Sequence, residues 1–383
     1  MNLTGEFKLS DRTKTDSPDV ALFLPSLRGG GAERVMLRLA EGFAEYGLAV
    51  DLVLVQYIGE YTDQVPSVVR VVNLKSPRVM NSLPLLVKYL CQVRPRAMIS
   101  AMSHVNIVAI LALKMARVNT TLVVTEHNHL TTSIKHNIYQ RARFIPSLMR
   151  ILYPWAEHIV AISEEMKRDL QTIISTPIEV IYNPVITQDV FREARKVPTL
   201  SYFGGEGFPL ILAAGRLTYQ KDFETLIRSF SIVRRKFRAR LVIIGEGDDR
   251  NKLESLVADL GLKNDVLLPG FIKNPYALMA KATAFVLSSR WEGLPTVLIE
   301  ALALGTPIVS TDCPSGPREV LRNGDFGLLV PVGDPQAMAT AILTVLDAPE
   351  RYGMTPEREE WVMQNFALDQ AVQKYLQVMG YDE

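Results

Sequence analysis

The feature that most constrains the fold is a repeated alternation of short apolar runs with longer helical patterns. The segment "VALFLPSL" precedes "AERVMLRLAEGFAEYG" and "VDLVLVQ", and later come "AMIS", "TLVVTEH" and "HIVAIS" with helical patterns between them. Short β-branched runs that alternate with helix-length patterns are typical of parallel sheets covered by helices. The sequence therefore predicts an α/β protein.

The alternation stops once and then restarts. The stretch "NPVITQDVFREARKVPTLSYFGGEG", residues 183–207, contains Pro and charged residues and suggests a connection between domains. Beyond it follow "LILAAG", "LVIIGEG", "VLLPGF" and "AFVLSS". The length of 383 residues also suits two domains. Ligands of open parallel sheets bind beyond the carboxyl ends of the strands. We therefore expect two Rossmann-like parallel-sheet domains facing across a cleft that holds the site.

Charge excludes one broad class of function. The 42 Lys and Arg residues balance the 41 Asp and Glu residues, which argues against a general nucleic-acid binder. The stretch from Arg70 to Arg150 nevertheless holds twelve basic residues and one acid, Glu126. Two interpretations stay open for this stretch: solvated helix faces, or a surface that meets anionic lipid or a phosphorylated acceptor.

The cysteines and the apolar segments indicate the cellular compartment of the protein. Cys91 and Cys313 provide neither a disulfide framework nor a metal-ligand spacing, which favours a reducing compartment. The polar start of the chain lacks the apolar region of a signal peptide, and "MISAMSHVNIVAILALKM" is too short and too polar to span a bilayer. The sequence predicts a cytoplasmic protein, with peripheral attachment to the inner face of the cell membrane as an alternative.

Two cations follow the first apolar run of the second half. In "AAGRLTYQKDFETLIRSF" a strand is expected to end at Gly215, Arg216 and Lys221 to occupy the loop, and a helix to start near Asp222. An Arg fork and a Lys point charge at such a turn can neutralise a diphosphate. Surface cations with no ligand are the alternative for each residue alone.

Two acids mark "RWEGLPTVLIEALALG", residues 290–305. Pro295 suits the first turn of a helix, whose free amides at Thr296 and Val297 favour an anion. Glu300 lies among apolar neighbours, where an unpartnered carboxylate is rare, and it can accept hydrogen bonds from vicinal hydroxyls. Glu292, before the helix, can hold sugar hydroxyls or be a plain surface acid.

The order of these motifs resembles the family 4 retaining glycosyltransferases of the GT-B fold. The likeness covers about residues 20–380 and includes "GGGAERV", "VVTEHN", "VAISE", "IYNPV", "IGEGDD", "LPGF" and "CPSGPREVLRNGDFGLLVP". The motifs "TEHN" and "CPSGP" are similar to those of bacterial enzymes that extend lipid-linked or surface-polysaccharide glycans. The resemblance implies transfer of a sugar from a nucleotide-sugar donor with retention of configuration, with a UDP-sugar as the family's usual donor.

The resemblance also implies roles for single residues. Arg216 and Lys221 would bind the diphosphate, Glu300 the ribose and Glu292 the transferred sugar. The full predicted donor-binding set is Gly30, Gly31, Arg216, Lys221, Phe271, Ile272, Glu292, Leu294, Pro295, Thr296 and Glu300. Phe271 and Ile272 would hold the base, and the predicted catalytic set is His127, Glu292, Arg216 and Lys221.

In the first half, glycines and a histidine follow two expected strands. Gly29, Gly30 and Gly31 permit close backbone approach to a phosphate, or they form a purely structural turn. The dinucleotide fingerprint fails because its last glycine position is Arg34. His127 ends "TLVVTEH" and can be structural, whereas the resemblance makes it the histidine that contacts the donor sugar.

The predicted organisation has five parts. These are a disordered tail over residues 1–19, an acceptor-side Rossmann-like domain over 20–190, a linker over 191–206, a nucleotide-sugar-binding domain over 207–365, and a helix over 366–383 that returns to the first domain.

The chemistry implied by the resemblance needs no metal and no cofactor. No Asp-x-Asp motif occurs in the chain, so Arg216, Lys221 and the helix terminus are expected to stabilise the leaving diphosphate in a front-face substitution.

The acceptor is predicted from the segment after His127, which mixes Lys135, Arg141 and Arg143 with bulky apolar residues. Such a mixture suits a membrane surface or a lipid diphosphate, and a helix packed on its own sheet is the alternative. The expected partners are a nucleotide sugar, a glycan or lipid-linked glycan, and an anionic membrane, with no nucleic acid. A soluble acceptor, a GT-B phosphorylase or epimerase, an NAD-dependent enzyme and a non-catalytic binder stay open as rival functions.

Overall fold

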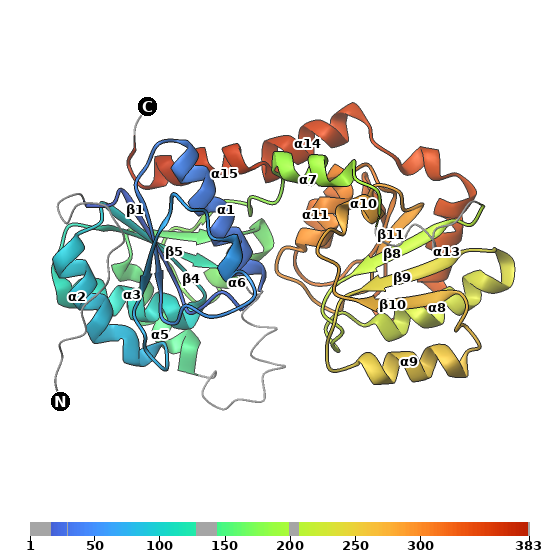
Figure 1. The fold of residues 1–383 in the computed structure, drawn as a ribbon, viewed down its shortest axis with the longest axis horizontal. Coiled ribbons are helices and arrows are strands. Elements are labelled where there is room, and N and C mark those ends of the chain that lie inside the picture. The colour runs from blue at the N-terminus through green and yellow to red at the C-terminus, as the bar shows by residue number, and fades with distance from the viewer. Residues whose placement is uncertain (1–16, 29, 128–143, 199–206, 382–383) are drawn as a thin grey trace. The chain divides into compact units, whose positions relative to one another are not determined.

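The computed structural model describes residues 17–28, 30–127, 144–198 and 207–381. The chain divides into two compact units, which Figure 1 shows as two sheets flanked by helices. Unit 1 contains Met1–Pro184 and Leu368–Glu383, and unit 2 contains Val185–Ala367.

The described part of unit 1 holds a seven-stranded parallel sheet with the order β3-β2-β1-β4-β5-β6-β7. Its strands are β1 Val20–Leu24, β2 Val50–Leu54, β3 Arg70–Asn73, β4 Ala97–Ala101, β5 Thr121–Glu126, β6 His158–Ala161 and β7 Glu179–Val180. Every residue of β1, β2 and β4 is buried. Strands buried on both faces read as continuous apolar runs, which is why the sequence pattern identifies them.

The helices of unit 1 connect successive strands, and the chain returns to this unit at α15. Those in the described residues are α1 Gly31–Glu45, α2 Leu83–Val93, α3 Ser103–Ala116, α5 Ile145–Leu152, α6 Glu164–Gln171 and α15 Leu368–Val378, with short 3₁₀ turns η1 Thr62–Gln64, η2 Met80–Ser82 and η4 Tyr153–Trp155. Ser163 caps α6, since its hydroxyl accepts a hydrogen bond from the Met166 N–H at 3.1 Å.

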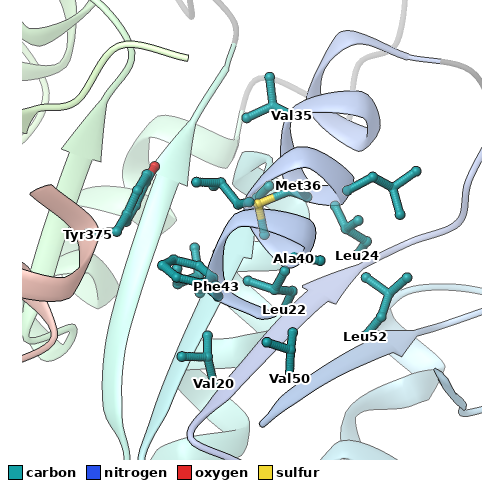
Figure 2. Close-up of a cluster of buried hydrophobic side chains, with 14 of the residues drawn as sticks. Val20, Leu22, Leu24, Val35, Met36, Ala40, Phe43, Val50, Leu52 and Tyr375 are labelled. Carbon is teal, nitrogen blue, oxygen red and sulfur yellow. The ribbon is translucent and has the colours of Figure 1, made fainter. Parts of the chain in front are cut away.

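Helix α15 packs on α1 and completes the core of unit 1. Phe43 and Tyr375 meet edge to face with ring centroids 6.4 Å apart, beside Leu22 and Val50 of the sheet (Figure 2). A Cβ at Gly42 would lie 2.6 Å from Val372 Cγ2, so glycine is what permits the two helices to approach this closely. The tail after α15 is also fixed, because Arg96 donates to the Gly380 carbonyl at 2.8 Å.

The described part of unit 2 holds a six-stranded parallel sheet with the order β10-β9-β8-β11-β12-β13. Its strands are β8 Leu210–Ala214, β9 Arg240–Ile244, β10 Val266–Gly270, β11 Ala284–Leu287, β12 Ile308–Thr311 and β13 Leu328–Val330. Its helices are α7 Gln188–Ala194, α8 Phe223–Lys236, α9 Arg250–Asp259, α10 Tyr276–Met279, α11 Thr296–Ala303, α12 Pro317–Val320, α13 Pro335–Asp347 and α14 Pro356–Phe366, with 3₁₀ turns η5 Arg322–Gly324 and η6 Pro349–Tyr352.

The two parallel sheets and the return of the C-terminal helix to the first unit confirm the predicted fold class. One segment forms a helix that was not predicted. Helix α7 lies inside the stretch 183–207, for which the sequence suggested only a connection. Asn274 Nδ2 donates to the Glu193 carbonyl at 3.0 Å and ties α7 to the start of α10 within unit 2.

Candidate functional site

Two loops meet at the carboxyl edge of the unit 2 sheet, because β8 and β11 are parallel neighbours. The loop after β8 and the loop after β11 are joined by three hydrogen bonds. Gln220 Nε2 donates to the Trp291 carbonyl at 2.9 Å, the Arg290 N–H donates to the Gln220 carbonyl at 2.8 Å, and the Ser288 hydroxyl donates to the Lys221 carbonyl at 2.7 Å. These bonds fix the backbone on both sides of the predicted donor site.

The joined loops hold an ion pair between two predicted site residues. Lys221 Nζ lies 2.6 Å from Glu292 Oε1, and the Ser289 hydroxyl donates to the same oxygen at 2.5 Å. The side chains are only 17% and 7% exposed, so loss of either partner leaves a poorly solvated charge. The stem of Lys221 lies over Gly215, where a Cβ would come within 3.3 Å of Lys221 Cε.

Other predicted residues lie at the same sheet edge without a described contact to this pair. Arg216 follows β8 and is exposed. Phe271 directly follows β10 and is 76% exposed, and Ile272 beside it is half-buried. An exposed cation and an exposed aromatic ring at the carboxyl edge of a parallel sheet are available to a ligand.

Helix α11 begins at Thr296, directly after Pro295. Pro295 is the N-cap, with φ −74° and ψ 95°. The first intrahelical bond of this turn runs from the Leu298 N–H to the Pro295 carbonyl at 3.0 Å, so the amides of Thr296 and Val297 precede the hydrogen-bond ladder. Leu294, also predicted for the donor site, is buried just before the cap.

The "CPSGP" segment supports this turn, a role that the sequence analysis did not assign. Gly316 has φ +98°, and a Cβ there would lie 2.4 Å from Pro295 Cδ. The Ser315 hydroxyl donates to the Gly293 carbonyl at 2.9 Å, and the Glu292 N–H donates to the Pro314 carbonyl at 3.1 Å. A glycine between Ser and Pro was the only signal in the sequence for such a close approach.

Glu300 lies in the middle of α11 with a fully buried side chain. The Tyr276 hydroxyl of α10 donates to Glu300 Oε1 at 3.1 Å. The structure therefore gives this carboxylate a partner that the sequence did not predict.

The C-terminal end of α11 is capped by a buried cation, Arg358 of α14, whose side chain is 1% exposed. Its guanidinium donates to the Leu302 carbonyl at 3.0 Å and to the Thr306 carbonyl at 2.7 Å. It also donates to the carbonyls of Tyr352 and Gly353 at 2.8 and 3.1 Å. A cation at this end of a helix is stabilised by the terminal carbonyls. Burial lowers the pKa of Arg358 to about 10.

In unit 1, Gly30 lies between β1 and α1, and Gly31 begins α1. Gly30 is the N-cap of α1, and Gly31 is the first helical residue and is exposed. A Cβ at Gly30 would lie 2.2 Å from the Glu33 carboxylate, whereas a Cβ at Gly31 would meet no atom within 4 Å. The close approach at this turn is therefore to the protein's own acid at the helix start.

His127 directly follows β5 and is 8% exposed. Its Nε2 lies 3.0 Å from the hydroxyl of Thr125, which also donates to the Ser100 carbonyl at 3.0 Å. Burial lowers the pKa of His127 to about 4, so the imidazole is neutral at neutral pH.

The residue before His127 anchors a buried polar network. Glu126 is 1% exposed and accepts hydrogen bonds from the Ser103 hydroxyl at 2.8 Å, from Asn106 Nδ2 at 2.9 Å and from the Tyr153 hydroxyl. The Asn106 amide also accepts from the Ser100 hydroxyl at 2.7 Å. Burial raises the pKa of Glu126 to about 7, although these hydrogen bonds act in the opposite direction.

The predicted acceptor residues Lys135, Arg141 and Arg143 lie outside the described residues. The neighbouring α5 does present an apolar stripe, which we call the α5 face. It consists of Phe144, Leu148, Ile151 and Trp155, which are 42–69% exposed, and Met115 of α3, which is 61% exposed. Lys114 Nζ lies 5.8 Å from the centre of the Trp155 ring.

Two kinds of feature are absent from the described residues. Within residues 17–28, 30–127, 144–198 and 207–381, no helix has the length and apolar character needed to cross a membrane. Across the same ranges, no three His, Cys, Asp or Glu side chains are grouped in a way that could hold a metal ion.

The fold is similar to that of known GT-B proteins. The solved structure of Anabaena HepE in complex with UDP and glucose matches with a TM-score of 0.77 at 18% identity, and the match covers 94% of this chain and 99% of that chain. The two parallel-sheet units and this likeness define a protein of the GT-B class.

Two family profiles together match most of the sequence. The profile described as "Glycosyltransferase Family 4" matches residues 29–189, and the profile described as "Glycosyl transferases group 1" matches residues 203–362. The chain belongs to the family 4 glycosyltransferases, which confirms the resemblance found from its motifs.

Two relatives come from Campylobacter jejuni. One, named N-acetylgalactosamine-N,N'-diacetylbacillosaminyl-diphospho-undecaprenol 4-alpha-N-acetylgalactosaminyltransferase, is 36% identical over 52% of this chain and 53% of its own length. The other, an alpha-1,4-N-acetyl-D-galactosaminyltransferase of a diphospho-undecaprenol-linked glycan, is 26% identical over 86% of this chain and 89% of its own. The chain spans about half the length of most of the curated relatives that it matches.

Proposed function

We propose that the chain is a retaining glycosyltransferase that moves a hexose or N-acetylhexosamine from a UDP-sugar to a glycan carried on a polyprenyl diphosphate. The observation that carries the proposal is the Lys221–Glu292 ion pair beside the start of α11. Family membership supports the reaction class, the HepE complex supports UDP, and the names of the Campylobacter relatives support the lipid-linked acceptor. We assign donor binding to residues 207–365 and acceptor recognition to residues 20–190.

The ion pair orients Lys221 for a phosphate. A lysine ammonium has three N–H donors, and Glu292 takes one of them, which leaves two for phosphate oxygens. Because Glu292 offsets the charge of Lys221, the net positive charge comes from Arg216 and from the amides of Thr296 and Val297. In this proposal Glu292 also holds hydroxyls of the transferred sugar.

The ribose is assigned to Glu300 and the base to Phe271 and Ile272. Since Glu300 is fully buried and bonded to Tyr276, the ribose hydroxyls reach its carboxylate only after a local shift between α10 and α11. The exposed ring of Phe271 is available to stack on the base. By family resemblance, His127 is the unit 1 residue assigned to the donor sugar.

The proposed reaction is a front-face substitution. The acceptor oxygen bonds to the anomeric carbon on the face from which the diphosphate leaves, the bond from that carbon to the diphosphate oxygen breaks, and the acceptor proton passes to the departing phosphate oxygen. Fixed cations and amides stabilise the charge that develops on the diphosphate. Transfer is expected to continue in excess chelator, and a strict requirement for a divalent ion would contradict this mechanism.

The test is a transfer assay with a panel of nucleotide sugars and with lipid-linked and free acceptors, followed by mass spectrometry. Lys221→Met is expected to lower kcat about 100-fold, the effect of removing one donor to a developing oxyanion. Lys236→Met, an exposed lysine of the same unit, is the matched control and should leave kcat unchanged. The double variant Lys221→Met with Glu292→Gln separates loss of catalysis from the instability of an unpaired Glu292.

The same assay separates the alternatives. Product formed only with free acceptors indicates a soluble small-molecule acceptor. Turnover that depends on orthophosphate indicates a phosphorylase, and an isomerised nucleotide sugar formed without acceptor indicates an epimerase. If Lys221→Met kept the kcat of the wild type, the ion pair would have no part in the mechanism.

We further propose that the α5 face rests on an anionic membrane and brings the enzyme to its lipid-linked acceptor. Exposed aromatic and aliphatic side chains lie there beside the exposed basic residues Lys114, Arg117 and Arg150. Apolar side chains next to basic ones suit the interface of a bilayer with anionic lipids. Lys135, Arg141 and Arg143, which lie outside the described residues, are assigned to acceptor or membrane contact from the sequence alone.

Co-sedimentation with phosphatidylglycerol vesicles tests this surface. The double variant Leu148→Glu with Ile151→Glu should reduce the bound fraction at least fivefold, since it places acids where the apolar stripe meets the lipid. Val68→Glu is the matched control, because Val68 and Ile151 are both 61% exposed on unit 1. Equal binding by the double variant and the control, or no binding by the wild type, would remove the membrane from the proposal.

A further inference from the structure

The contacts of Thr125 determine which nitrogen of His127 carries a proton. The Thr125 hydroxyl has one proton and lies 3.0 Å from both the Ser100 carbonyl and His127 Nε2. A carbonyl oxygen only accepts hydrogen bonds. If the hydroxyl donated to His127, two oxygen lone pairs would face each other at the Ser100 contact. Both contacts are hydrogen bonds only when Thr125 donates to Ser100 and accepts from an Nε2–H.

The proton arrangement defines what the other ring nitrogen can do. A neutral imidazole has one N–H, so protonation of Nε2 leaves Nδ1 as an acceptor. Burial makes the neutral form dominant, because it holds the pKa of His127 near 4. His127 in this state accepts a hydrogen bond from a substrate hydroxyl and has no proton to give at Nδ1.

Thr125 is well placed to hold the ring in this state. It is fully buried within β5, and its β-branched side chain has few accessible rotamers. Its neighbour Glu126 is fixed by Asn106, which also donates to the Thr125 carbonyl at 2.9 Å. Ser100, whose carbonyl accepts the Thr125 hydrogen bond, also donates its hydroxyl to Asn106 and so belongs to the same network.

We infer that Thr125 is a positioning residue that fixes His127 in the Nε2–H tautomer, so that Nδ1 accepts a hydrogen bond from a hydroxyl of the bound substrate. This inference rests on the proposed function for the identity of the substrate, a sugar nucleotide. It assigns Thr125 no contact with the substrate, because its hydroxyl is occupied by Ser100 and His127.

The test combines nitrogen-15 NMR of the imidazole with kinetics. In the wild type and in Thr125→Ser, Nδ1 of His127 should show the chemical shift of an unprotonated nitrogen, with the proton on Nε2. Thr125→Val keeps the shape of the side chain and removes the hydroxyl, so it should give a mixture of tautomers and lower kcat about tenfold, the worth of a hydrogen bond to a neutral group. Thr125→Ser should restore both readouts.

Thr121→Val, at the opposite end of β5, controls for the change of a strand threonine to valine and should leave both readouts unchanged. Thermal unfolding of each variant shows whether a lower kcat is caused by loss of the folded state. The tautomer is read without any substrate, so it tests the inference even if the enzyme transfers no sugar. A proton on Nδ1 in the wild type, or an unchanged tautomer and kcat in folded Thr125→Val, would overturn the inference.

Discussion

Replacement of Arg358 by Met tests how the donor-site helix is held in place. The buried guanidinium lies at the C-terminal end of α11, the helix that carries Glu300 and whose first turn follows Glu292. Methionine fills a similar volume and removes every hydrogen-bond donor. The change therefore reports on the hydrogen bonds and the charge more than on packing.

The magnitude follows from the contacts of the guanidinium. Four carbonyls accept from Arg358 at 2.7–3.1 Å. A hydrogen bond to a charged group contributes about 1.5–3 kcal/mol, so the four together contribute at least about 6 kcal/mol. Burial of the charge offsets several kcal/mol of this sum. The expected net loss of unfolding free energy is about 3 kcal/mol.

Thermal and urea unfolding measure the effect. For a unit of this size about 1 kcal/mol corresponds to 2–4 °C, so the Tm of unit 2 should fall by about 6–12 °C. Arg358→Lys keeps the charge without the fork and should lie between wild type and Arg358→Met. Arg351→Met, an exposed arginine in the turn before α14, is the matched control and should change the Tm little.

A loss below about 1 kcal/mol in Arg358→Met would refute this reasoning, because it would mean that solvent or the neighbouring backbone replaces the donors without penalty. A donor KM that rises in folded Arg358→Lys, with an unchanged Tm, would instead show that the cation sets the position of α11 more than its stability.

Three further predictions concern other parts of the chain. Gly42→Ala should lower the unfolding free energy of unit 1 by about 1 kcal/mol, measured by urea unfolding, because the new Cβ meets Val372 at 2.6 Å and overpacking outweighs the gain in helix propensity. A rise in stability would contradict this. For Glu126, the folded-state pKa of about 7 exceeds the ordinary value of 4.5, so the folded state binds more protons and stability is lost as pH rises between them. The stability of the wild type relative to Glu126→Gln should therefore fall by up to about 3 kcal/mol from pH 4.5 to 7, and a flat difference would be the opposing result. For the thiols, burial and the nearby Glu292 charge raise the pKa of Cys313 to about 12, so a thiol reagent at pH 8 should modify exposed Cys91 much faster than Cys313, as peptide mass spectrometry would measure.

Periodicity predicted the elements of this fold because it is a local property of the sequence. The apolar runs at Val20–Leu24 and Leu210–Ala214 are buried strands, and the loops after them hold Gly30 and Arg216 where they were expected. Pro295 lies at the start of α11, where it is the N-cap.

The contacts around the site were not predictable in the same way, because their partners are distant in sequence. The Lys221–Glu292 pair joins residues 71 positions apart, and the family motif gave both residues without giving their contact. The burial of Arg358 had no signal, since "PEREEWVMQNF" reads as an ordinary charged helix. Asn106, in an apolar helix, likewise gave no sign that it bonds Glu126.

The place of α15 in unit 1 has a consequence for synthesis. The ribosome releases the strands of this unit first, yet Val372 and Tyr375, which cover Phe43, emerge only after the whole of unit 2. Until then α1 exposes an apolar groove that can attract chaperones or other nascent chains. Ribosome-bound nascent chains stalled before residue 368 should therefore stay sensitive to protease in α1, and those extended through the helix should become resistant.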